Sequence, residues 1–126
     1  METPVFLIVE RNAVIGQDLA EIVRGRDPGC QVTVVTGMDA AEAFLATQVP
    51  SLTAAFVAVP RDGEPNLAAL ADRIRGAGGE IVVMREFADQ RDLPQGWHVL
   101  ARPFTTNTVL RVLNDIQRGD QTGDRV

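Results

Sequence analysis

Charged side chains directly follow several apolar stretches of this chain. Glu10 and Arg11 come after the run Val5–Val9, and Arg85 and Arg102 follow two later apolar runs. Arginine suits the recognition of carboxylates and phosphates, because its planar guanidinium can donate two parallel hydrogen bonds. Carboxylates nearby would instead neutralise the arginines. The residue types therefore indicate either an anion site or an ion-pair network, of which we favour the network.

Other residue types that carry out chemistry are scarce. Cys30 is the single cysteine and His98 the single histidine, which excludes an internal disulfide framework and a cysteine-based zinc cluster. We interpret His98 as a surface or strand-edge histidine. The glycine-rich stretch at residues 76–79 follows a helix pattern and precedes a strand, whereas phosphate-binding glycines lie between a strand and a helix. The sequence thus predicts no cofactor, no metal and no enzymatic activity.

The composition limits the class of protein. The chain has 126 residues, of which 45% are hydrophobic, and a net charge of −5, as expected for one globular domain. Its 17 acidic against 12 basic residues argue against a protein that coats nucleic acid. The apolar runs are too short to cross a bilayer. We expect a cytoplasmic domain with no direct contact to nucleic acid or membrane.

Apolar runs rich in β-branched residues alternate with helical patterns along the chain. The expected strands cover residues 5–9, 31–36, 53–59, 81–84 and 99–101. Strands that are apolar along their whole length indicate a parallel sheet covered on both faces by helices. Five such units in this length predict an α/β, flavodoxin-like, doubly wound five-stranded sheet of order 2-1-3-4-5. The functional site is then expected at the carboxyl ends of the first and third strands.

Local signals predict where the helices begin and end. We expect Asn12, Asp39 and Thr105 to cap three helices, and Pro65 to begin another. The last helix should turn an apolar stripe that includes Leu113 toward the sheet. Weak periodicity between residues 85 and 97 predicts a short or loose fourth helix. The domain is expected to span residues 1–118, followed by a disordered tail at 119–126.

Four features at the strand ends carry a family resemblance. They are the acidic end of Leu7-Ile-Val-Glu10, the run at residues 54–58 that opens into a Pro/Asp/Gly turn, the strand at 81–84 after a glycine-rich helix end, and Arg102-Pro103-Phe104. In this order and spacing, over residues 4–118, they resemble the receiver domain of bacterial two-component response regulators. The resemblance also implies that the Arg102–Pro103 peptide is cis.

In that family, a kinase histidine transfers a phosphoryl group to an aspartate, an acidic pair holds Mg²⁺, and a hydroxyl residue and a lysine contact the phosphoryl group. The resemblance places a degenerate version of this pocket at Glu10, Arg11, Ala58, Arg85 and Arg102. A register shifted by two residues would put Phe56 rather than Ala58 at the aspartate position. A methyl group or phenyl ring cannot attack phosphorus. One carboxylate beside the Arg11 guanidinium, which could pair with Glu10, is a poor host for Mg²⁺.

The chain is therefore identified as a degenerate pseudo-receiver without the phosphoacceptor aspartate. The resemblance implies a phosphorylation-independent signalling module that binds a histidine kinase, an output domain, another regulator or a second copy of itself. Two alternatives remain open: phosphorylation at a displaced carboxylate such as Asp62, and sensing of an anion or nucleotide by the arginines. The family's interaction face corresponds here to Phe87, Trp97, Val99, Pro103 and Phe104.

Overall fold

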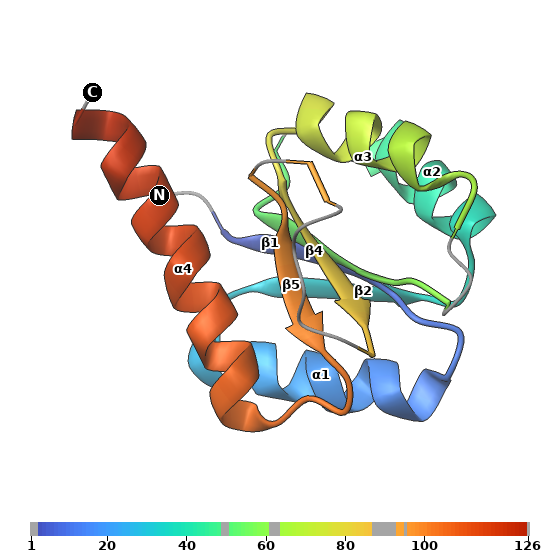
Figure 1. Cartoon of the computed structure of the whole chain (residues 1–126), viewed down its shortest axis with the longest axis horizontal. Coiled ribbons are helices and arrows are strands. Elements are labelled where there is room, and N and C mark those ends of the chain that lie inside the picture. Colours follow the sequence, from blue (N-terminus) through green and yellow to red (C-terminus); the bar gives the residue numbers. More distant parts are fainter. Residues whose placement is uncertain (1–2, 49–50, 61–63, 87–92, 95, 126) are drawn as a thin grey trace.

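The computed structural model describes residues 3–48, 51–60, 64–86, 93–94 and 96–125; it describes the backbone alone for 47–48 and 118–125. Five parallel strands form one sheet of order β2-β1-β3-β4-β5 (Figure 1). The strands are β1 (Val5–Val9), β2 (Gln31–Val35), β3 (Ala54–Ala58), β4 (Glu80–Arg85) and β5 (His98–Ala101). The predicted fold class and strand order are confirmed.

In the part of the chain that the structure describes, two helices cover each face of the sheet (Figure 1). The helices α1 (Ala13–Arg26) and α4 (Thr106–Arg125) lie on one face, and α2 (Met38–Gln48) and α3 (Leu67–Gly76) lie on the other. Alternating strand residues supply two cores. Ile8 and Phe56 belong to the core under α1 and α4, whereas Leu7 and Val57 belong to the core under α2 and α3. Because β1 and β3 are buried on both faces, they hold the strand ends of the candidate site rigidly.

The expected helix starts agree with the structure in part. The Asn12 side chain accepts hydrogen bonds from Val14 N and Ile15 N, and the Thr105 hydroxyl accepts one from Thr108 N, so both caps are confirmed. The expectation for Asp39 is wrong, because α2 begins one residue earlier and Asp39 lies in its first turn. Pro65 does not begin α3, because a turn from Glu64 O to Leu67 N precedes the helix.

The last helix extends past the expected domain boundary. Helix α4 runs to Arg125, through residues that we assigned to a disordered tail, and Ile116 is the last buried residue among the side chains that the structure describes. The domain boundary at residue 118 stays a prediction. The fourth helix expected between β4 and β5 falls largely on residues 87–92 and 95, outside the described residues. The Arg102–Pro103 peptide is cis, as predicted.

No helix in the described part of the chain is both long and apolar enough to span a bilayer.

Candidate functional site

The ends of β1 and β3 lie side by side at the carboxyl edge of the sheet. Val9 pairs with Val57, so the next residues, Glu10 and Ala58, are neighbours across the two strands. Together with Arg11 from the β1–α1 connection and Arg102 from the end of β5, they line a shallow cavity of about 160 Å³. We call this cavity the strand-end pocket; Val59 and Pro60 complete its described lining.

Glu10 is the charged residue buried in this pocket, with a side chain only 5% exposed. Its Oε1 accepts a hydrogen bond from Asn12 N at 3.1 Å, which bends the chain into α1. Its Oε2 has no hydrogen-bond donor among the described residues and lies 3.5 Å from Arg102 Nη1. The carboxylate is therefore compensated on one side by a backbone amide and on the other by an ion pair.

Gly16 lets α1 pack closely over this part of the sheet. A Cβ atom added at Gly16 would lie 2.8 Å from Val34 Cγ1, inside van der Waals contact, and 3.6 Å from Glu10 Cβ. A larger residue would push the helix away from β1 and β2. The close approach of α1 therefore contributes to the burial of the Glu10 side chain.

The two arginines of the pocket have different partners. The Arg102 side chain is 27% exposed, faces Glu10 and also donates from Nη2 to Val59 O at 3.4 Å. The Arg11 side chain is 77% exposed and points to Glu64, at 3.8 Å. The expectation that Arg11 could pair with Glu10 is wrong, because Arg102 occupies that place. The sequence analysis did not single out Glu64, although its place in the turn that follows β3 was a usable signal.

The structure brings together four of the five predicted pocket residues. Arg85 is not among the residues that line the pocket; it ends β4, where its carbonyl accepts a hydrogen bond from Arg102 N at 2.8 Å. Phe56 is fully buried in the core under α1 and α4, so Ala58 is the β3 side chain at the pocket. Asp62 lies outside the described residues.

The chemistry open to the described part of the pocket is limited. Its one lining carboxylate, Glu10, already faces a guanidinium, and the β3 side chain beside it is a methyl group. The described residues contain no group of three or more histidine, cysteine, aspartate or glutamate side chains that could hold a metal ion. The described lining residues include no nucleophilic side chain with a general base beside it.

A groove of about 450 Å³ adjoins the pocket and shares Arg102 with it. Its apolar lining comes from Ile15 of α1 and from Pro103 and Phe104 after β5. Two carboxylates, Asp18 and Glu86, lie among these apolar groups. The sequence analysis missed Asp18, although its spacing of three residues from Ile15 puts both on one side of the helix. The groove combines apolar surface with negative charge.

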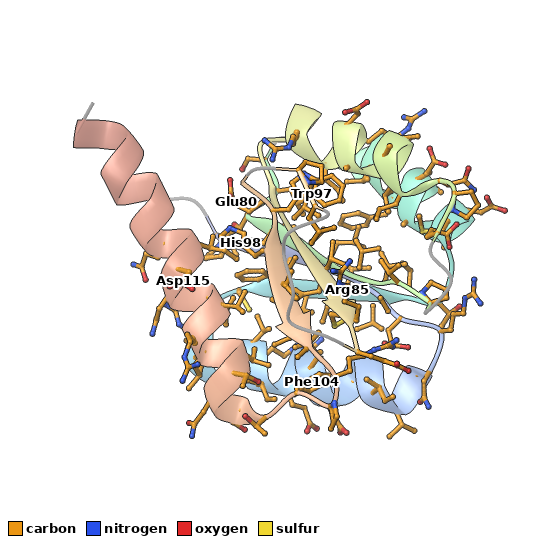
Figure 2. All side chains as sticks on the ribbon, viewed as in Figure 1. Glu80, Arg85, Trp97, His98, Phe104 and Asp115 are labelled. Carbon is orange, nitrogen blue, oxygen red and sulfur yellow. The ribbon has the colours of Figure 1, made fainter. Side chains whose placement is uncertain are left out.

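The side chains of the predicted interaction face do not all lie together. Trp97 packs against the core under α2 and α3, and Phe104 packs against the core under α1 and α4. Figure 2 shows these two side chains at opposite ends of β5. Pro103 is exposed, Val99 is half-buried, and Phe87 lies outside the described residues. Trp97 and Phe104 therefore belong to two separate surfaces.

The single histidine and single cysteine both lie away from the pocket. His98 begins β5 and its Nε2 lies 3.1 Å from Glu80 Oε1, beside Trp97 (Figure 2). This contact fits the interpretation of His98 as a strand-edge residue, although we did not expect the carboxylate. Cys30 is half-buried before β2, and burial, followed by the negative charge of Asp27, raises the pKa of its thiol.

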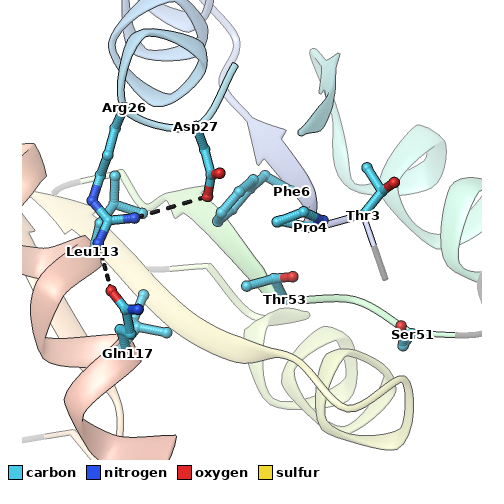
Figure 3. A pocket seen from close by; sticks show the side chains of 10 residues that line it. Thr3, Pro4, Phe6, Arg26, Asp27, Ser51, Thr53, Leu113 and Gln117 are labelled. Carbon is cyan, nitrogen blue, oxygen red and sulfur yellow. Dashed lines mark hydrogen bonds and ion pairs between the residues drawn. The ribbon is translucent and has the colours of Figure 1, made fainter. Parts of the chain in front are cut away.

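A second cavity, of about 230 Å³, lies at the opposite end of the sheet, between α1, α4 and the amino ends of β1 and β3 (Figure 3). Arg26 at its rim donates to Asn114 Oδ1 at 2.9 Å and to Gln117 Oε1 at 2.8 Å. These bonds join α1 to α4, which gives Arg26 a structural role.

Comparisons with known proteins identify the fold. No protein-family model matches the sequence, and no curated protein matches it significantly. Solved structures do. The signal receiver domain of an HD domain-containing protein from Pseudomonas fluorescens is 16% identical, with a TM-score of 0.73, over 96% of this chain and 99% of that chain. A CheY-like response regulator receiver domain from Methylobacillus flagellatus is 20% identical, with a TM-score of 0.64, over 91% of this chain and 99% of that one.

A third similar structure is longer than this chain. The anti-anti-sigma factor PhyR from Bartonella quintana is 13% identical, with a TM-score of 0.71, over 99% of this chain and 51% of PhyR. This chain thus spans about half the length of PhyR. At these identities, the similarity shows that the chain has the receiver fold, as the sequence predicted.

Proposed function

We propose that this chain is a signalling module of the two-component type that acts as a pseudo-receiver, by binding another protein and without being phosphorylated. The observation that carries the proposal is the side chain of Ala58 at the end of β3, in the strand-end pocket. Formation of an acyl phosphate needs a carboxylate nucleophile at the position that the resemblance assigns to Ala58. A methyl group cannot supply one.

The ion pair between Glu10 and Arg102 supports the same proposal. Mg²⁺ prefers several oxygen ligands in octahedral geometry, usually including one or two carboxylates. The Arg102 guanidinium already lies 3.5 Å from Glu10 Oε2, and the neighbouring position holds Arg11 instead of a second carboxylate. A divalent cation here would have to displace one guanidinium and approach another. The pocket is thus better suited to an internal ion pair than to phosphoryl transfer.

Protein binding is the activity that remains for such a domain, and the groove beside the pocket supports it. Pro103 and Phe104, which we assign to the interaction face, line this groove together with Ile15 and the two carboxylates. One structural neighbour is named an anti-anti-sigma factor, a name that refers to another regulatory protein. We propose a partner of the same kind here: another signalling protein, such as a kinase, an output domain or a regulator.

Incubation with acetyl phosphate and Mg²⁺, followed by intact mass measurement, tests this function. We expect no added phosphoryl group, under conditions in which a receiver domain with an intact aspartate is modified. An added phosphoryl group would contradict the proposal. If the Asp62→Asn variant then lost it, the displaced-carboxylate alternative would be established. Because both pocket arginines already oppose carboxylates, titration of the same protein with inorganic phosphate should show no saturable binding; stoichiometric binding would favour the anion-sensing alternative.

A further inference from the structure

Strand β2 forms one edge of the sheet and pairs on one side only. Its parallel register with β1 runs from Val5 opposite Gln31 to Val9 opposite Val35. Gln31 N donates to Pro4 O at 2.8 Å, and Val35 O accepts from Glu10 N at 2.9 Å. Because alternate residues of a parallel strand turn their backbone groups to the same side, residues 31, 33 and 35 face β1. The N–H and C=O groups of Val32 and Val34 therefore point to the open side.

The open side of β2 is poorly protected against pairing. Among the residues that the structure describes, one hydrogen bond reaches it, from Arg24 Nη2 to Val32 O at 3.4 Å. Residues 31–36 contain no charge and no proline, and five of the six are β-branched. Soluble proteins usually block such an edge with lysine, proline, a bulge or a covering segment. This edge has instead the composition of a strand that pairs with another strand.

We propose that β2 pairs with β2 of a second copy of this chain, antiparallel about a two-fold axis at Thr33. In this register, Val32 of one copy lies opposite Val34 of the other, and each such pair exchanges two backbone hydrogen bonds. The two pairs use all the outward N–H and C=O groups of Val32 and Val34 in both copies. The two Thr33 side chains face one another at the axis, where hydroxyl groups can form a cross-strand hydrogen bond.

Polar side chains on the exposed flank of α1 fit a second copy of this chain. Gly16 packs over Val34 and Arg24 reaches Val32, so α1 runs antiparallel along β2. Glu21 is exposed and lies three residues before Arg24, on the neighbouring surface of the helix. The two-fold axis brings the Val32 end of one copy to the Val34 end of the other. Arg24 of each copy then approaches the exposed Gln17 of its partner, whose amide oxygen can accept a hydrogen bond, and its charge offsets Glu21 of its own helix near the axis.

The net charge of the chain also restricts where two copies can meet. At a formal charge of −5 for each copy, association through an acidic surface is opposed by repulsion. Residues 31–36 are uncharged, so the copies can approach there without placing carboxylates against one another. This proposal is independent of the proposed signalling function, because it rests on the edge of β2 and not on the strand-end pocket.

Charge-swap variants of the full chain at the two-fold axis test the pairing and its register. Thr33 is half-buried, and its side chain lies on the face of the sheet opposite to Val32 and Val34, which pack toward α1. Thr33→Glu or Thr33→Lys would place like charges about 4.5 Å apart, measured between the two Cα atoms. We expect the unmodified chain to dimerise in sedimentation velocity across a concentration series. Each variant alone should dimerise at least about tenfold more weakly, and an equimolar mixture of the two should recover the dimer.

Matched variants on a distant surface show whether the effect is specific to the edge of β2. Ala68→Glu and Ala68→Lys introduce the same charges on the exposed surface of α3 and should leave dimerisation unchanged. Far-ultraviolet circular dichroism checks that the Thr33 variants are folded, and recovery on mixing shows it independently. A chain that is monomeric at every concentration, a dimer insensitive to Thr33→Glu, or variants that do not associate on mixing would each overturn the proposal.

Discussion

The buried middle of the sheet and the rim at its carboxyl end differ in what determines their residues. In the middle, Leu7, Ile8, Phe56 and Val82 are fully buried and pack between two layers of helices. At the rim, Glu10 is buried beside a half-buried Arg102 and an exposed Arg11. The chain as a whole has the receiver fold, with 91–99% of its length covered, although identity is only 13–20% in the three structures compared.

On the proposed function, the fold and the chemistry of this domain are separable. Packing the middle of the sheet requires apolar side chains of about the right volume, which many sequences supply. At the rim, stability requires only that a buried charge has a partner of opposite charge and that the polar backbone groups at the strand ends are hydrogen-bonded. A pocket can therefore lose its nucleophile while the scaffold beneath it is maintained, because function depends on the site and not on the fold.

The largest effect should come from placing a charge in the middle. Leu113 on α4 is 3% exposed and belongs to the core under α1 and α4. Leu113→Asp removes this packing and buries an unpaired carboxylate, so the free energy of unfolding should fall by about 3 kcal/mol or more. Urea denaturation measures the change. Arg111→Asp, at an exposed position two residues earlier, should change it by less than about 0.5 kcal/mol; a similar loss in both variants would show that α4 does not pack as described.

The middle of the sheet was also the part most easily predicted from sequence. Continuous β-branched runs such as Val5–Val9 can be recognised without knowing their neighbours, and alternation of strands with helices leaves few topologies. The Asn12 cap depends on contacts within three residues, so its prediction also held. The carboxyl ends of parallel strands lie at the same edge of the sheet. The sequence alone therefore predicted that Glu10, Ala58 and Arg102 lie near one another.

The ion pairs of the rim could not be predicted in the same way. Whether Glu10 faces Arg11 or Arg102 depends on the path of the connections and on the reach of long side chains, not on a local pattern. The partner of Arg11 is Glu64, which lies in the turn after β3. No periodicity in the sequence predicts the shape of this turn. The separation of Trp97 from Phe104 was accessible from sequence, because Trp97 precedes β5 and Phe104 follows it, which places the two side chains at opposite ends of the strand (Figure 2).

An intermediate effect is expected where the rim is buried. Arg102→Ala leaves Glu10, whose side chain is 5% exposed, without its ion-pair partner. An uncompensated buried charge should lower the free energy of unfolding by about 1–3 kcal/mol. Combining it with Glu10→Gln should recover part of the loss, because the double variant no longer buries a charge. Urea denaturation of the four proteins in this cycle gives the coupling between the two residues; strictly additive effects would show that the pair does not stabilise the rim.

The smallest effect is expected where the rim is exposed. Arg11 is 77% exposed and meets Glu64 at 3.8 Å, so solvent screens the pair and its side chain has little packing to lose. Arg11→Ala should change the free energy of unfolding by no more than about 1 kcal/mol. Urea denaturation at low and high salt measures it, with Arg102→Ala as the matched arginine from the same pocket. A loss from Arg11→Ala as large as that from Arg102→Ala would break the distinction, because the rim would then depend on its exposed charges as much as on its buried one.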